Sequence, residues 1–181
     1  KHSYARYITY IYYPLFCYMN DTSIKIKVAL ADDHVLLRNA LATLIDNFGD
    51  CKVIHHSGSG KELTESIESG TVPDVVILDL NMPNMNGFET AEWLHKNHPA
   101  IPVLLLTMYD SELSMIKLLQ TGVKGFLKKD VHPSELNFAI HSVVQSGFYY
   151  SNHSTGKLVN LFRNNPDGNT GLQKALLSDQ E

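Results

Sequence analysis

The sequence is short of cysteine, of positive charge and of long apolar stretches, and each shortage excludes a class of protein. Its two cysteines, Cys17 and Cys51, stand in unrelated contexts without metal-ligand spacing, so we interpret both as free thiols in a reducing compartment. The 15 basic and 19 acidic residues give a net charge of -4, which provides no basic surface for a nucleic-acid backbone. The longest apolar run has about a dozen residues, too few to cross a bilayer. We therefore expect a cytoplasmic protein without membrane contact.

The 181 residues suffice for one ordinary domain with extensions. Residues 1–18 are rich in tyrosine and interrupted by Pro14, whereas Met19 precedes a polar stretch and an alternating strand pattern. For 1–18 we favour an expression-derived or upstream extension over a native signal-like segment. The expected domain then covers 19–150. The segment 151–176 contains the turn-rich stretch NNPDGNTG, which is typical of a linker.

Five short apolar runs alternate with segments of helical spacing. The runs are IKIKVALA, CKVIHH, PDVVILDL, IPVLLLT and KGFLK. The third and fourth consist almost entirely of Val, Ile and Leu, as expected for central strands that helices cover on both faces. This alternation predicts an α/β fold with doubly wound (βα)5 topology and a flavodoxin-like parallel sheet of five strands.

The helical segments are expected to cover the two faces of that sheet. Apolar residues of the first helix recur at a spacing that puts them on one face, which should pack on the strands: they are Leu36, Leu37, Ala40, Leu41, Leu44 and Ile45. Further helices are expected over 60–70, 87–98, 111–121 and 133–147. Helix-ending and helix-starting residues mark several of these bounds, with Gly122 after the fourth helix and Pro133 at the start of the last.

Polar residues stand at the expected carboxyl ends of the strands, where open α/β sheets collect their functional groups. These residues are Asp32 and Asp33, Asp79, Thr107, and Lys128 and Lys129. Three carboxylates in one crevice repel one another by about 1 kcal/mol per pair at 4 Å in water, and by more near a protein surface. A cation is needed to offset this repulsion, and oxygen ligands suit Mg2+ better than zinc. An aspartate in such a site can act as a nucleophile toward phosphorus.

The motifs ADDH, ILDLNMPNMNG, LLLT and GVKGFLKKD, in this order over roughly 24–150, resemble the receiver domains of response regulators. Each motif alone is weak, but their joint occurrence at strand ends is specific. The resemblance implies that Asp79 is the phosphoacceptor and that a sensor histidine kinase is the donor. It also implies a Mg2+ ion held by Asp32, Asp33, Asp79 and the main-chain carbonyl of Asn81.

The resemblance assigns further residues around that pocket. It implies Thr107 as a switch hydroxyl, Phe126 in the aromatic switch position and Lys129 as the amine that pairs with the phosphoryl group. Pleat alternation from Phe126 favours Lys129 over Lys128 as the inward side chain. One member of the acid pair is expected to cap the following helix, and we expect Asp33 to be the closer metal ligand.

Two positions depart from the common receiver pattern. Phe126 lacks a phenolic hydroxyl, and Asp130 follows Lys129 where many receivers have proline. The second departure resembles the NarL/FixJ branch, whose members carry a LuxR-type helix-turn-helix after the receiver. The final residues, LSDQE at 177–181, resemble the opening of such a DNA-binding domain. We therefore expect DNA contact only through the missing C-terminal domain, and a homodimer on phosphorylation.

Other functions fit the pattern less well. A Mg-dependent phosphatase with an aspartate nucleophile would need a second acid two residues on, where this chain has Asn81. A flavodoxin-like cofactor binder would need a phosphate loop in place of ADDH. A degenerate receiver that serves as an interaction scaffold is disfavoured because no site position is missing. We therefore expect no enzyme activity beyond Mg-dependent self-phosphorylation and autodephosphorylation.

Overall fold

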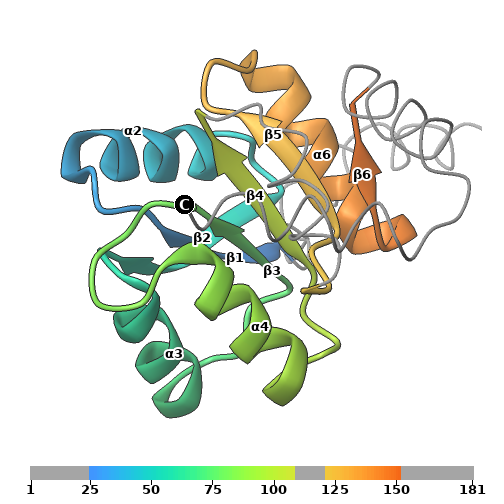
Figure 1. Cartoon of the computed structure of the whole chain (residues 1–181). Coiled ribbons are helices and arrows are strands. Elements are labelled where there is room, and N and C mark those ends of the chain that lie inside the picture. The colour runs from blue at the N-terminus through green and yellow to red at the C-terminus, as the bar shows by residue number, and fades with distance from the viewer. Residues whose placement is uncertain (1–24, 109–120, 152–181) are drawn as a thin grey trace, which may run out of the picture.

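The computed structural model describes residues 25–108 and 121–151. In these ranges the chain forms a six-stranded parallel sheet in the order β2-β1-β3-β4-β5-β6, with helices on both faces (Figure 1). The strands are β1 (Ile26–Ala31), β2 (Cys51–Ser57), β3 (Val75–Leu78), β4 (Val103–Thr107), β5 (Gly125–Lys128) and β6 (Tyr149–Tyr150). The helices are α2 (Val35–Asp46), α3 (Gly60–Ser69), α4 (Gly87–Asn97) and α6 (Pro133–Ser146). The doubly wound α/β fold is confirmed, with all five expected strands present.

The strand order reverses beside β1, because β2 lies on one side of this strand and β3 on the other. All strand pairs are parallel, so the carboxyl ends of β1 and β3 lie at the same edge of the sheet. In open α/β sheets the chain segments that leave two such strands diverge to opposite faces and leave a crevice between them. The topology therefore places the expected functional edge at the ends of β1 and β3.

Two apolar cores hold the helices against the sheet. One lies between the strands and helices α2 and α6, and the other between the strands and helices α3 and α4. Every residue of β3 and of β4 is buried, which agrees with the expectation that these two apolar runs form central strands. Burial on both sides fixes the positions of these strands and of the residues that follow them.

The expected apolar stripe of α2 is only partly right. Leu41 and Ile45 are buried as expected, but Leu36 is 86% exposed, and Ala40 is exposed as well. A helix buries a stripe about 100° wide, and successive residues lie about 100° apart around the helix axis. Residues 36 and 40 each precede an inward position, 37 or 41, and therefore lie outside the buried stripe. Ala42 takes the buried place instead.

The helix ends follow the local signals in the sequence. Asn86 precedes α4 and forms a capping box, in which its side chain accepts from the Glu89 amide and the Glu89 carboxylate accepts from the Asn86 amide. Pro133 opens α6, and Gly147 closes it with φ at 83°, a left-handed conformation that glycine adopts readily. These caps fix where the chain leaves each helix.

Several predictions concern residues that the structure does not describe. Residues 111–120 of the helix expected over 111–121, the extension 1–18, the linker from residue 152 on and the segment 177–181 all lie outside the described residues. Within the described ranges, no helix combines the length and apolar character needed to traverse a membrane.

A sixth strand, β6, was not predicted. Its two residues pair with β5 at the edge of the sheet, Tyr149 beside Gly125 and Tyr150 beside Phe126. Two residues are too few to show a strand periodicity, so the sequence pattern could not reveal it. The Tyr149 hydroxyl donates a hydrogen bond of 2.8 Å to the Glu135 carboxylate, which ties β6 to the first turn of α6.

We expect Tyr149→Phe to lower the free energy of unfolding by about 1 kcal/mol at neutral pH, because one partly buried hydrogen bond is lost. Burial and then the neighbouring Glu135 raise the pKa of Tyr149 from near 10 to about 12. A raised pKa means that the stabilisation is complete below pH 10 and is lost between pH 10 and 12. Urea unfolding across this range should show wild type and variant converging. A constant difference, or the same difference for Tyr150→Phe, would contradict this role.

Candidate functional site

Two buried aspartates follow neighbouring strands at the carboxyl edge of the sheet. Asp32 follows β1 and is 1% exposed, and Asp79 follows β3 and is 5% exposed. The last residues of the two strands, Ala31 and Leu78, are paired across the sheet, and the Asp79 amide donates to the Ala31 carbonyl at 2.9 Å. The register of two central strands therefore brings the two carboxylates together.

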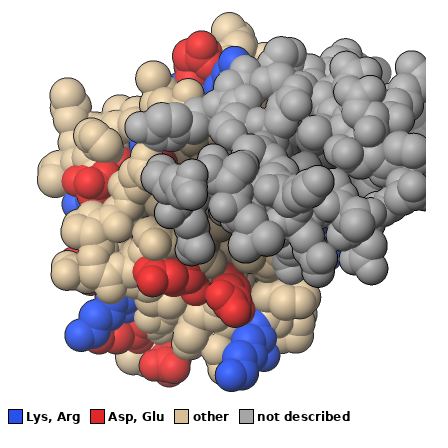
Figure 2. Space-filling model, viewed as in Figure 1, with Lys and Arg blue, Asp and Glu red and all other residues tan. Residues whose placement is uncertain are grey.

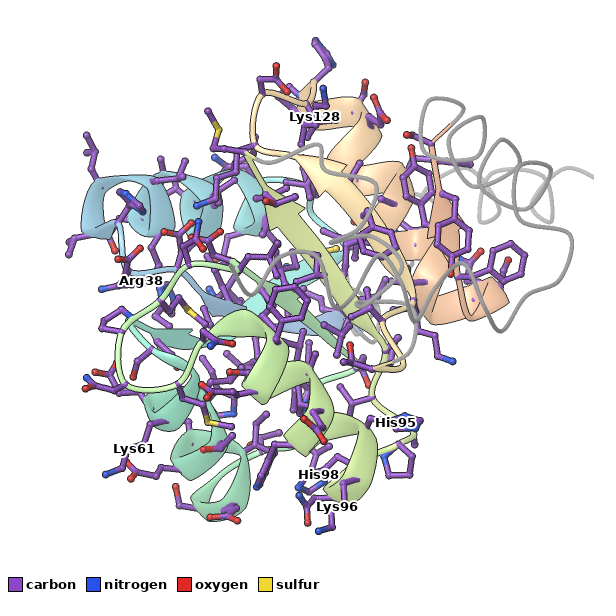
Figure 3. The ribbon with its side chains drawn as sticks, viewed as in Figure 1. Arg38, Lys61, His95, Lys96, His98 and Lys128 are labelled. Atoms are coloured by element: carbon purple, nitrogen blue, oxygen red, sulfur yellow. The ribbon has the colours of Figure 1, made fainter. Side chains whose placement is uncertain are left out.

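Lys129 forms ion pairs with both carboxylates. Its ammonium lies 2.8 Å from Asp32 Oδ2 and 2.8 Å from Asp79 Oδ2, and its side chain is 6% exposed. Burial alone would lower the pKa of Lys129, but the hydrogen bonds to Asp32 and Asp79 outweigh it and raise the pKa. The neighbouring Lys128 is exposed and is the last residue of β5 (Figure 3). The structure thus places Lys129 inward, at the position that pleat alternation favoured.

The two acids of the pair differ in burial. Asp32 is the buried acid beside Lys129, and the Asp33 side chain is 35% exposed. The expected cap is wrong, because the residue at the cap position of α2 is His34; Asp33 as the closer metal ligand stays a prediction. His34 Nδ1 lies 3.2 Å from Asp32 Oδ1 and 2.8 Å from Asp33 Oδ1. Oxygens of Asp32, Asp33 and Asp79 and a ring nitrogen of His34 all lie within 4.8 Å of one another.

The loop after Asp79 is held close to that residue. The Leu80 amide donates to Asp79 Oδ1 at 2.8 Å, and the Gly87 amide donates to the Leu80 carbonyl at 2.9 Å. A Cβ at Gly87 would lie 2.4 Å from the Asp79 carbonyl oxygen, so only glycine permits this approach. Asn81, whose carbonyl was expected to bind metal, is exposed within this loop.

The two expected switch residues lie on adjacent strands. Thr107 ends β4 and is 7% exposed, and its carbonyl accepts from the Lys129 amide at 3.1 Å. Phe126 lies within β5, is 4% exposed, and stacks on Tyr150 with ring centroids 6.0 Å apart. Lys129 is thus joined through the backbone to Thr107, and Phe126 lies between the core and the edge strand β6.

Sequence reasoning missed Arg38. From the first turns of α2 its guanidinium donates to the Asp32 carbonyl, and it extends toward the loop before α3 (Figure 3), where a Cβ on Gly58 would lie 3.3 Å from Arg38 Nη1. The signal that could have revealed it is a cation six residues after a buried acid, on the helix that starts at the pocket. A positive charge beside the pocket favours the approach of an anion.

The charged groups on the visible, described part of the surface form no basic patch. Figure 2 shows acidic and basic side chains mixed over the described part of the visible face, with uncharged surface between them. No basic patch covers that part of the face, in line with the net charge of -4. On this face, therefore, no surface charge patch competes with the buried acid cluster and its lysine as a site for an anion.

The donor set fits a hard divalent cation. Its oxygens come from the carboxylates of Asp32 and Asp79, which are buried, and of Asp33, which reaches solvent, while the one nitrogen beside them belongs to the exposed His34. Mg2+ takes oxygen ligands and keeps several waters, and the half-exposed Asp33 leaves a solvent-facing side for those waters. Lys129 already offsets part of the negative charge, which suits a metal that binds and leaves.

The fold and the site together define the class of protein: it is a doubly wound α/β domain with a buried acidic pocket at the point where the strand order of the sheet reverses. The model of the response regulator receiver domain matches residues 28–141, and the chain belongs to this family. It is 31% identical over 139 residues to the transcriptional regulatory protein DegU of Brevibacillus brevis, covering 77% of this chain and 58% of DegU. It is 32% identical over 141 residues to the nitrate/nitrite response regulator protein NarL of Escherichia coli (strain K12), covering 76% and 63%.

A solved structure shares both fold and sequence. The signal receiver domain of the putative response regulator NarL from Mycobacterium tuberculosis is 30% identical and superimposes with a TM-score of 0.64, covering 67% of this chain and 97% of that domain. The chain spans about three fifths of the curated relatives it matches, 58% of DegU and 63% of NarL. It is thus a receiver domain of the NarL type, and receiver domains are signalling proteins.

Proposed function

We propose that Asp79 accepts a phosphoryl group from a sensor histidine kinase in a Mg-dependent reaction, and that this changes the surface of the domain. One observation carries the proposal: a buried ammonium, Lys129, lies 2.8 Å from each of two buried carboxylates at the switch point of the sheet. This is the charge arrangement that a phosphoryl group needs, with a nucleophile and a cation at one place.

Asp79 supplies the attacking oxygen. A new bond forms from its carboxylate oxygen to phosphorus while the bond from phosphorus to the donor breaks, and the donor leaves with the electron pair. Lys129 stays beside the oxygens that gain negative charge, and the Thr107 hydroxyl donates to one of them. When bound, Mg2+ neutralises further charge on the transferring group, with Asp32, Asp33, Asp79 and the Asn81 carbonyl as its ligands. Hydrolysis of the acyl phosphate then resets the domain.

The change is passed on through β4 and β5. A hydroxyl that turns toward the phosphoryl group leaves room beside β4, and a buried ring can shift to fill it. Thr107 and Phe126 are the two residues in these positions, and Phe126 stacks on Tyr150 of the edge strand. Phosphorylation would therefore alter the β5–β6 edge and the adjoining face of α6.

For the longer protein we propose a cytoplasmic transcription factor. DegU is described as a transcriptional regulatory protein, and a LuxR-type domain after this receiver would supply DNA binding. On this proposal residues 1–18 are an extension, 19–150 the receiver, 151–176 a linker and 177–181 the start of the DNA-binding domain, with phosphorylation favouring a homodimer. The family match gives no support to the phosphatase, and the intact pocket gives none to the degenerate scaffold.

The test is phosphoryl uptake by the whole chain. Intact mass spectrometry after incubation with acetyl phosphate and Mg2+ should show a gain of about 80 Da, one phosphoryl group. With EDTA in place of Mg2+ the gain should be absent or much smaller. No gain at any Mg2+ concentration would overturn the proposal and leave a scaffold role. Release of phosphate far in excess of the protein would favour the phosphatase.

A further inference from the structure

A second cluster of metal-ligand types lies at the other end of the sheet. Asp50 immediately precedes β2 and Cys51 begins it, so both lie at the amino ends of the parallel strands, opposite to the pocket around Asp79. The Ile26 amide donates to the Asp50 carbonyl at 2.9 Å, which fixes this corner to β1. His141 comes from α6, the helix that packs on the same face of the sheet as Cys51.

The three side chains converge on one point. His141 Nε2 lies 2.9 Å from Asp50 Oδ2, and one ligand atom each of Asp50, Cys51 and His141 lies within 4.8 Å of the others. Cys51 is fully buried, whereas the side chains of His141 and Asp50 are 26% and 51% exposed. The thiol thus closes the inner side of the cluster, and the carboxylate faces solvent.

The chemistry of these donors differs from that of the acidic pocket. A thiolate, an imidazole and a carboxylate are the three ligand types that zinc takes, at about 2.3, 2.0–2.1 and 2.0–2.2 Å. Tetrahedral coordination at those lengths puts ligand atoms about 3.3–3.8 Å apart. Ligand atoms up to 4.8 Å apart at present would need to close by at most roughly 1–1.5 Å, and His141 Nε2 and Asp50 Oδ2, now 2.9 Å apart, would need to open by roughly 0.4 Å.

We propose that Asp50, Cys51 and His141 bind one Zn2+ ion, with water as the fourth ligand on the exposed side. When the metal–sulfur bond forms, the thiol proton leaves to solvent and the ion takes its place. Displacing that proton from the buried Cys51 requires a metal that binds sulfur strongly. Mg2+, which prefers oxygen, does not compete here.

Metal binding at this site would join parts of the chain that are far apart in sequence. Asp50 and Cys51 stand at the start of β2 and His141 lies in α6, the helix followed by β6. A ligand that binds only the folded arrangement stabilises the fold. Zinc would therefore clamp α6 to the β1–β2 corner, whereas the phosphoryl switch is proposed to act on the side of the same helix that adjoins β6.

The test uses the whole chain, with its thiols reduced and excess Mg2+ present to occupy the acidic pocket. Competition with a chromogenic chelator measures zinc affinity and stoichiometry, and Co2+ as a substitute reports a bound thiolate through its sulfur-to-metal charge-transfer absorption. We expect one zinc per chain, a thiolate band with Co2+, and a rise in melting temperature of a few degrees at saturating zinc.

Matched variants locate the ion. Cys51→Ala and His141→Gln should each weaken zinc binding by at least about tenfold, and Cys51→Ala should also remove the thiolate band. Cys17→Ser, which changes the other cysteine, and Asp79→Asn, which changes the acidic pocket, should retain both. Wild-type affinity in His141→Gln, or a thiolate band that follows Cys17, would overturn the proposal. His141→Gln changes a partly exposed side chain and keeps the test decisive if Cys51→Ala folds poorly.

Discussion

Asp79→Asn should abolish phosphoryl uptake from acetyl phosphate, leaving no detectable gain in intact mass. The substitution keeps the shape of the side chain and an oxygen that can accept from the Leu80 amide, now at 2.8 Å from Asp79 Oδ1. It removes the negative oxygen that attacks phosphorus. It also removes one of two buried like charges 2.8 Å from Lys129, so the variant should unfold at the same temperature as wild type or higher.

Asp74→Asn provides the matched control. Asp74 precedes β3 at its other end, where its carboxylate accepts from the Lys27 amide at 2.8 Å. An asparagine there retains an acceptor oxygen and leaves the pocket untouched. This variant should take up one phosphoryl group at the wild-type rate. Uptake by Asp79→Asn, or loss of uptake in Asp74→Asn, would place the phosphoacceptor elsewhere.

The strands and most of the pocket could be predicted because their signals are local. Apolar runs of Val, Ile and Leu specify buried parallel strands, and a polar residue directly after such a run must lie at the carboxyl edge. Asp32, Asp79 and Thr107 follow from that logic alone. The choice of Lys129 over Lys128 needed only the alternation of a strand, and the structure places the Lys129 ammonium inside the pocket.

The parts that were missed depend on tertiary contacts. Leu36 fits a helical stripe as well as Leu37 does, and only the position of the sheet decides that Leu36 is exposed. One of Asp32 and Asp33 was expected to cap α2, but the turn after β1 puts His34 at the cap position and Asp32 beside Lys129. Cys51 and His141 are too far apart in sequence for any spacing rule to connect them. Their association follows from α6 packing on the same core as β2.

Lys129→Met should be the most destabilising change in the pocket when Mg2+ is absent. It leaves Asp32 and Asp79 buried, close together and without the cation that contacts both at 2.8 Å. Removing one partner of a buried ion pair typically lowers the free energy of unfolding by about 3–5 kcal/mol. Urea unfolding at neutral pH in EDTA measures this loss. Lys124→Met, at an exposed position just before β5, should stay within about 0.5 kcal/mol of wild type.

The response of Lys129→Met to Mg2+ separates a charge effect from a packing effect. If the lost stability is electrostatic, Mg2+ should restore more of it in the variant than it adds to wild type, because the ion replaces the missing charge. In wild type the raised pKa of Lys129 gives the pH dependence: its stabilisation is complete below the ordinary value of 10.5 and is lost as the pH rises through the raised one. The variant lacks this group and should lack this loss of stability. A variant that stays equally weak in EDTA and in Mg2+ would show that Lys129 acts by packing alone.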